Sequence, residues 1–275
     1  MSETKAIPKA KLKAMNEPPI LYSREGHIGL LELNRPEGRN AMTPELLDAF
    51  AETLPSIRAD RELRVLIITG RGSCFSAGAD FKAGVQREGG GGLPHERSYG
   101  MYEPFLGVLD IDVPIIGALN GHAVGGGFGL TLLTDIRIGN REAKYGANFA
   151  RIGLHSGLGI SYLLPRLIGI SKASELLFTG RLIRGEEAER IGLFSKAVAP
   201  EAVLDEARAL AEEIASAAPL AVRAMKATMR RMNGLRIKEA AAIEAPIQAE
   251  TLATEDAKEG MNAILEKRAP KFKGR

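Results

Sequence analysis

The sequence predicts an α/β fold in which helices alternate with the strands of a parallel sheet, followed by a helical C-terminal region. The prediction rests on two apolar, β-branched runs at 65–69 (VLIIT) and 114–119 (PIIGAL) and on a third predicted strand at 135–138 (DIRI). Continuous apolar runs of this kind are typical of strands covered on both faces, and helices between them act as crossover connections. A chain of 275 residues suits one domain of this class, or one domain with a small appendage.

Elements before the first covered strand are predicted from turn and capping residues. Short β-like runs at 20–22 and 28–33 are separated by a turn at 24–27 (REGH), which predicts a hairpin. A helix is predicted to begin at Thr43 and Pro44, because the threonine hydroxyl can cap the first turn and proline is preset for it.

The last third of the chain is predicted to be helical. Residues 202–217 are amphipathic, and Pro219 can open the next helix. Pro246 is expected to kink or interrupt a helix within 240–253. The predicted organisation is a flexible basic arm at 1–19, a core at 20–195 and a helical region at 196–275.

Composition and charge exclude several classes of protein. Apolar residues make up 45% and charged residues 26%, as in globular domains, and the net charge of +3 is too small to indicate nucleic acid by itself. Cys74 is the only cysteine, which excludes an internal disulfide and favours a reducing compartment. No apolar run approaches the roughly 20 residues of a membrane helix, and no signal peptide is recognised. We therefore expect a cytoplasmic protein without a membrane or nucleic-acid partner.

Two glycine-containing segments carry the functional signal. They are 75–80 (FSAGAD) and 120–129 (NGHAVGGGFG), and each follows a predicted covered strand. Ligands of α/β folds bind at the carboxyl ends of strands, and the second segment also enters a helix at its positive end. Glycine and alanine let a ligand approach the main-chain N–H groups closely.

Three other functions of glycine-rich loops do not fit the spacing. A dinucleotide-binding fingerprint would need glycine at Leu130 or Leu132, and the Gly-Lys-Ser/Thr of a P-loop is absent from the chain. In 153–157 (GLHSG) the serine stands one place too late for a nucleophile elbow. What remains is a pair of loops that offer two N–H donors to one carbonyl oxygen. Such donors stabilise an enolate or tetrahedral oxyanion by about 3 kcal/mol each in the transition state.

On these motifs the sequence resembles the crotonase (enoyl-CoA hydratase/isomerase) superfamily. Segments 34–36 (NRP) and 40–41 (NA) are similar to its early strand-to-helix turn, and the two glycine segments are similar to its signature loops. Later landmarks at 179–180, 192–193 and 260–273 follow in the family's order, so the resemblance covers residues 20–275.

The resemblance implies a spiral of repeated ββα units and a helical C-terminal region that assembles trimers or hexamers. It implies an acyl-CoA thioester as ligand, with coenzyme A as part of the substrate and no other cofactor. No metal is expected, because the four histidines are scattered and no His/Cys/Asp cluster has ligand spacing. By position, the backbone amides of Ala79 and Gly126 would form the oxyanion hole. Contacts with coenzyme A are implied for Arg39, Ala77, Asp80, Phe272 and Lys273, of which the last two belong to a tail that often reaches the adenosine end.

The sequence departs from the family at the two glutamates that hydratases use as a paired acid and base. These positions hold Gly129 and Phe149, which cannot transfer a proton. His155 and Glu103 are the remaining catalytic candidates, because imidazole titrates near neutral pH and Glu103 follows the loop expected to roof the acyl pocket. For both, a purely structural or solvent-facing role stays open.

Two functions of different class follow. The first is an acyl-CoA enzyme that hydrates, isomerises or otherwise forms an enolate with an unusual proton-transfer group. The alternative is a homologue with another acyl-CoA reaction, such as hydrolysis or decarboxylation, or a CoA-binding protein without catalysis. RNA binding would rest only on the N-terminal lysines, which lack interleaved aromatic residues.

Overall fold

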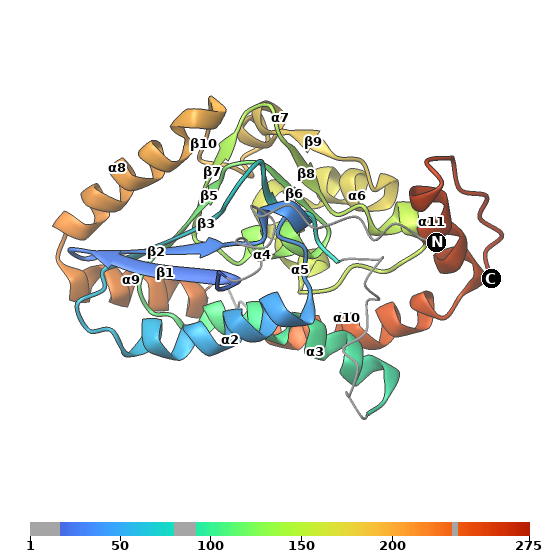
Figure 1. Cartoon of the computed structure of the whole chain (residues 1–275), viewed down its shortest axis with the longest axis horizontal. Helices are drawn as coiled ribbons and strands as arrows, with labels where there is room; N and C mark the ends of the chain where they lie inside the picture. Colours follow the sequence, from blue (N-terminus) through green and yellow to red (C-terminus); the bar gives the residue numbers. More distant parts are fainter. Residues whose placement is uncertain (1–16, 80–91, 233–235) are drawn as a thin grey trace, which may run out of the picture.

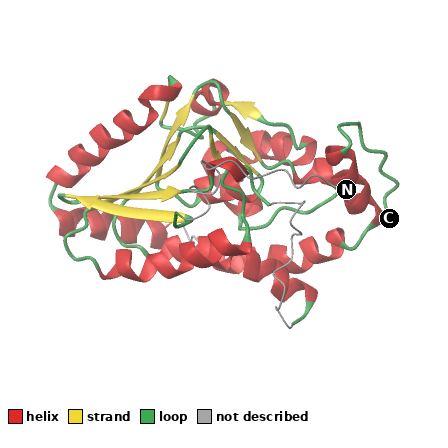
Figure 2. Cartoon of the chain, viewed as in Figure 1, coloured by secondary structure: helices red, strands yellow, loops and turns green. Residues whose placement is uncertain are grey.

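The structure is a computed structural model, and it describes residues 17–79, 92–232 and 236–275. Strands lie in the middle of the molecule and helices surround them (Figures 1 and 2). Most of the expected arm at 1–19 lies outside the described residues.

A six-stranded sheet contains the three covered strands. Its spatial order is β1-β2-β3-β5-β7-β10, and all neighbours are parallel except β1 and β2. The antiparallel β1–β2 pair confirms the predicted hairpin, with Tyr22 opposite Leu31. The strands are β1 (Ile20–Glu25), β2 (Ile28–Leu33), β3 (Val65–Gly70), β5 (Ile115–Leu119), β7 (Ile136–Asn140) and β10 (Lys196–Val198).

A second sheet of four short strands gives the fold its spiral. It consists of β4 (Cys74–Ser76), β6 (His122–Val124), β8 (Lys144–Gly146) and β9 (Ile183–Arg184). Each of β3, β5 and β7 in the large sheet leads directly into β4, β6 and β8 of the small sheet, and helical turns follow each pair. The expected spiral of ββα units is therefore present.

The apolar run of β3 is divided between two cores, which explains why it shows no alternation of polar residues. Val65 and Ile67 pack with helix α8 (Val203–Ser216) on one face of the sheet. Leu66 and Ile68 pack into the larger core on the other face. In Figure 1, α8 lies along the outer side of the six-stranded sheet.

The other helices surround the strands and build the wall of the site. Helices α3 and α10 pack against each other beside α2 (Figure 1). The helices are α2 (Pro44–Ala59), α3 (Pro94–Leu106), α4 (Gly126–Leu132), α5 (Ile160–Ile168), α6 (Ile170–Thr179), α7 (Gly185–Arg190), α9 (Pro219–Met232), α10 (Ile237–Leu252) and α11 (Glu255–Leu265), with 3-10 turns η1 (Pro36–Gly38), η2 (Gly107–Asp110), η3 (Phe149–Ile152) and η4 (Pro200–Ala202).

Two local expectations need correction. Helix α10 continues through Pro246 without interruption, because its packing against α3 and α5 offsets the hydrogen bond that proline removes. The last third of the chain, predicted to be helical, also contains β10, and β9 lies at its start; both strands are too short to show periodicity in the sequence.

Candidate active site

Asn40 holds the first glycine segment in place after β4. Its side chain is fully buried, and its amide nitrogen donates to the carbonyl oxygens of Arg71 at 3.0 Å and Cys74 at 2.8 Å. Its side-chain oxygen accepts from the backbone N–H of Arg35 at 2.7 Å. The Asn40 φ angle of 51° lies in the left-handed region, which asparagine tolerates better than most residues. The Ser76 hydroxyl then donates to the Asn40 carbonyl at 2.8 Å.

The end of this segment pairs with the chain before α2. The backbone N–H of Met42 donates to Gly78 O at 2.8 Å, and Met42 and Ala79 form a parallel β-bridge. In such a bridge the N–H of Ala79 points away from Met42. No described residue accepts a hydrogen bond from this N–H.

The second glycine segment approaches the first through main-chain atoms. Gly126 is the first residue of α4, and its N–H also has no acceptor among the described residues. Gly78 has a φ of +80°, and a Cβ there would lie 2.6 Å from Val124 O and 3.3 Å from Gly126 N. Only glycine permits this approach. The amide of Ala79, the residue after Gly78, is thereby brought near the amide of Gly126.

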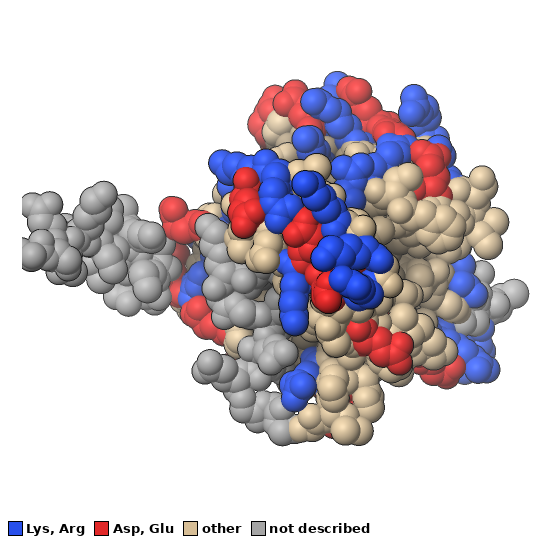
Figure 3. Space-filling view, turned by 90° about the vertical axis from the view of Figure 1, so that its right-hand side faces the viewer, with Lys and Arg blue, Asp and Glu red and all other residues tan. Residues whose placement is uncertain are grey.

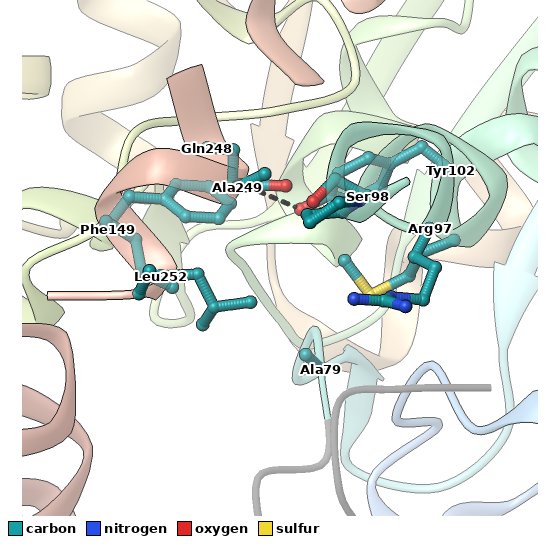
Figure 4. Close-up of a pocket in the computed structure, with 12 residues that line it drawn as sticks. Ala79, Arg97, Ser98, Tyr102, Phe149, Gln248, Ala249 and Leu252 are labelled. Carbon is teal, nitrogen blue, oxygen red and sulfur yellow. Dashed lines mark hydrogen bonds between the residues drawn. The ribbon is translucent and has the colours of Figure 1, made fainter. Parts of the chain in front are cut away.

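A cavity of about 230 Å³ opens beside Ala79. Its walls come from α3 and α10, whose side chains face each other in Figure 4 with Ala79 below them. Among the lining residues that the structure describes, Arg97, Ser98, Tyr102 and Gln248 are polar and none is acidic. The rest are apolar, including Met101, Phe149, Leu154 and Leu252.

Tyr102 and Gln248 form the polar centre of this cavity. The amide nitrogen of Gln248 donates to the Tyr102 hydroxyl and to the His155 carbonyl oxygen, both at 3.0 Å. Both side chains are buried, with exposed fractions of 4% and 3%. Burial raises the pKa of Tyr102 well above its ordinary value, although the Gln248 hydrogen bond opposes this. Tyr102 therefore remains neutral at physiological pH.

The two positions at which the resemblance predicts glutamates, 129 and 149, differ in their surroundings. Phe149 lines the cavity, so the wall has an apolar ring at the position where the resemblance predicts a carboxylate. Gly129 does not line it, and a Cβ there would lie 2.6 Å from Leu158 Cδ2. Leu158 is fully buried and has a φ of 63°, in the left-handed region.

The two catalytic candidates from the sequence are not among the cavity-lining residues. Glu103 is exposed on α3, one position after Tyr102. The imidazole Nδ1 of His155 lies 2.6 Å from Ser156 O, and the His155 backbone N–H donates to Thr251 Oγ1 at 2.9 Å. Of this loop, Leu154 faces the cavity.

The candidate coenzyme A contacts are spread over two regions. Arg39 is exposed beside the first glycine segment, and its carbonyl accepts from Ala77 N at 3.0 Å. Asp80 lies outside the described residues. Phe272 is 43% exposed, and Lys273 Nζ lies 3.7 Å from Glu255 on α11.

The C-terminal tail folds back along α11. Asp256 accepts from the backbone N–H groups of Lys273 and Gly274 at 2.6 and 2.7 Å, and Arg268 pairs with Glu259. Basic and acidic side chains are consequently interspersed on this side of the molecule (Figure 3). A phosphate that binds Lys273 would compete with Glu255.

Sequence reasoning missed the role of α10 in the site. Gln248 stands in a stretch with no motif, and only the tertiary contact of α10 with α3 brings it beside Tyr102. Within the described ranges, no three His, Cys, Asp or Glu side chains are arranged to hold a metal ion. No helix in that part of the chain is long and apolar enough to span a membrane.

Comparisons with known proteins agree with the resemblance in the sequence. The sequence model of a family described as enoyl-CoA hydratase/isomerase matches residues 23–275. A crotonyl-CoA hydratase from Syntrophomonas wolfei is 37% identical, over 92% of this chain and 97% of its own length. An (E)-benzylidenesuccinyl-CoA hydratase from Thauera aromatica is 36% identical, over 93% and 99%. The crystal structure of an enoyl-CoA hydratase/isomerase from Pseudoalteromonas atlantica superposes with a TM-score of 0.83 at 30% identity, covering 93% of this chain and 100% of the other.

Proposed function

Because the chain belongs to the enoyl-CoA hydratase/isomerase family and is a crotonase-type enzyme, we propose that it stabilises the enolate of an acyl-CoA thioester with the N–H groups of Ala79 and Gly126. The approach of Gly78 to Gly126 N supports this proposal, since it brings the amide of Gly126 near that of Ala79, which lines the cavity, and neither amide has an acceptor among the described residues. Gly126 N also stands at the positive end of α4. Two such donors fit one thioester oxygen whose negative charge grows as the enolate forms.

The proposal is tested on the thioester carbonyl itself, which avoids assuming a particular reaction. Butyryl-CoA labelled with ¹³C at the carbonyl should show a lowered carbonyl stretching frequency when bound to the protein, measured by difference infrared spectroscopy. Ala79→Pro removes one donor and should reduce the shift by roughly half, because one of the two hydrogen bonds to the carbonyl oxygen is lost.

Ala79→Gly is the matched control, because it changes the side chain and keeps the N–H. It should retain the shift seen in the unchanged protein. A bound thioester whose carbonyl frequency equals that of the free ligand would contradict the oxyanion hole, even if the ligand binds tightly.

A second candidate function is acyl-CoA binding with a reaction other than hydration. It is favoured by the apolar Phe149 in the cavity wall and by the absence of acidic side chains among the lining residues described. Turnover should then be sought with a panel of enoyl-, ketoacyl- and acyl-CoA esters. Rapid hydration of crotonyl-CoA would exclude this alternative, whereas binding without hydration would support it.

We also propose that the chain acts as a homotrimer or hexamer and needs no cofactor beyond the coenzyme A of its substrate. Large apolar side chains are exposed on α6 and α9, among them Phe178 at 78% and Leu220 at 79%. Exposed apolar groups of this size favour burial between subunits. Light scattering coupled to size-exclusion chromatography measures the assembly, and a monomer at micromolar concentration would contradict it.

A further inference from the structure

Glu244 on α10 is a buried carboxylate that lies outside the cavity. Its exposed fraction is 2%, and among the described Asp and Glu residues it alone is buried. It does not line the cavity between α3 and α10. No lysine, arginine or histidine in the described ranges forms an ion pair with it. A buried charge needs compensating partners, so other groups must hold this carboxylate.

The loop at 156–161, which leads into α5, supplies those partners. Glu244 Oε2 accepts from the backbone N–H of Gly159 at 2.6 Å, and Oε1 accepts from the backbone N–H of Ser161 at 2.9 Å. The hydroxyls of Ser161 and Ser156 also donate to Oε1, the latter at 3.5 Å. These donors surround the N-terminal end of α5, which favours a negative charge. Glu244 therefore caps α5 from a neighbouring helix and fixes the path of the loop.

Leu158 connects this loop to α4, and α5 packs against both α10 and α4 (Figure 1). Its φ of 63° is rare for leucine, so the loop must be held in this conformation by its surroundings. Its side chain fills the space beside Gly129, where a Cβ would lie 2.6 Å from Leu158 Cδ2 and 3.2 Å from Ile160 Cδ1. Gly129 lies one turn after Gly126 in α4. The loop that Glu244 holds thus packs against the helix that carries one of the proposed oxyanion donors.

We propose that Glu244 is a positioning residue for the oxyanion hole. By fixing the loop at 156–161, it sets through Leu158 the position of α4 and of the Gly126 N–H. The inference rests on the proposed function, since it concerns the same donor. Glu244 itself transfers no proton, because it does not line the cavity and donors occupy both of its oxygens. Hydrogen bonds weaken steeply with poor geometry, so a small shift of α4 is felt at the thioester oxygen.

Glu244→Gln tests the proposal by changing one oxygen into an amide nitrogen. The N–H groups of Gly159 and Ser161 can only donate and bind different oxygens, so one of them faces the amide nitrogen in either orientation. The loop should shift, and the bound ¹³C-labelled butyryl-CoA should lose part of the lowering of its carbonyl frequency. The loss should reach at most roughly half, the amount expected when one of two donors disappears. The dissociation constant of coenzyme A alone, measured by calorimetry, should not change.

Glu250→Gln is the matched control, because Glu250 is exposed on the same helix and the substitution removes the same charge. It should retain the full lowering of the carbonyl frequency. The frequency is a property of the bound molecules, so a smaller folded fraction weakens the band and leaves its position unchanged. The measurement therefore separates positioning from a role in stability alone.

Two further variants test the route and cover the case in which Glu244→Gln does not fold. Glu244→Asp keeps the charge but is one methylene shorter, so it should give a smaller loss in the same direction. Leu158→Ala should also reduce the lowering of the carbonyl frequency. Combined with Glu244→Gln it should cause no loss beyond the larger single effect, because both substitutions act on the same contact with α4.

The outcomes separate this inference from the proposed function. An unchanged carbonyl frequency in Glu244→Gln, or in Glu244→Asp if the first variant does not fold, overturns the positioning role and leaves the oxyanion hole intact. Full additivity of the losses in Glu244→Gln and Leu158→Ala overturns the route through Leu158. A carbonyl frequency that is not lowered in the unchanged protein contradicts the proposed function first.

Discussion

Leu158 occupies the space into which a side chain at residue 129 would extend, and this contact can be measured as a coupling energy. In Gly129→Ala the new Cβ would lie 2.6 Å from Leu158 Cδ2 and 3.2 Å from Ile160 Cδ1, and both neighbours are fully buried. Overpacking of this kind costs about 1–3 kcal/mol, against a gain of about 1 kcal/mol in helix propensity. The variant should therefore lose up to about 2 kcal/mol of stability.

Leu158→Ala alone should lose about 2–5 kcal/mol, because it leaves a cavity in the core. In the double variant the 2.6 Å contact no longer exists, so the overpacking disappears while the helix propensity gain remains. The free energy of unfolding of the double variant should exceed the additive value by about 1–3 kcal/mol, measured by urea denaturation. Additivity within about 0.5 kcal/mol would refute the proposed contact.

The same geometry predicts how carboxylates introduced at positions 129 and 149 would behave. Gly129→Glu combined with Phe149→Glu should not raise crotonyl-CoA hydration, because the side chain at 129 would enter apolar space around Leu158 that does not line the cavity. A large gain in hydration, measured by loss of the enoyl thioester absorbance, would show that the two carboxylates reach the substrate after all.

Three further predictions concern other parts of the chain. Burial lowers the pKa of Lys226 to about 8 from its ordinary 10.5. Between these two pH values the unfolded state binds more protons than the folded state. The free energy of unfolding should therefore rise by about 1 kcal/mol per pH unit in this window. Thermal melts of Lys226→Met should not show this rise of stability with pH. An unchanged dependence of stability on pH in the variant would contradict the assignment to Lys226. Asn40→Ala should lower the free energy of unfolding, measured in urea, by about 2–4 kcal/mol, because the side-chain hydrogen bonds are lost. Asn40→Gly should lower it by about 1 kcal/mol less, because glycine accepts the left-handed φ. Equal losses in the two variants would argue against backbone strain. Glu103→Gln should keep kcat/KM within about twofold of the starting enzyme, because the carboxylate is exposed outside the cavity, and a much larger drop would assign it to the reaction.

The sequence predicts those elements of the fold whose burial shows directly in their own residues. Strands β3 and β5 are buried at every position, so their apolar runs identify them without any knowledge of their neighbours. The strands β9 and β10 have two and three residues, and they exist only because β8 and β7 provide partners. Their sequences contain no periodic signal, and tertiary pairing alone defines them.

The candidate site likewise has residues that the sequence could indicate and residues that only the tertiary structure brings to it. The two glycine segments could be found in the sequence because a close approach of main chains demands small residues, whereas Ala79 and Gly126 were assigned within them only by the resemblance to the family. Gln248 could not, because its importance depends on a hydrogen bond to a tyrosine 146 positions earlier in the chain. Glu103 was favoured for its chemistry, but the helix turns it away from the cavity that its neighbour Tyr102 lines.

Helix α10 contributes a wall of the cavity that is separate in the chain from the two glycine segments. The amides that would activate the thioester belong to loops fixed at the sheet edge by Asn40 and Gly78, whereas the opposite wall is contributed by a helix near the end of the chain. Substitutions at the cavity-lining residues of α10 can reshape what the enzyme accepts without disturbing those loops. A directed library confined to those positions is therefore a route to new acyl preferences on an unchanged reactive centre.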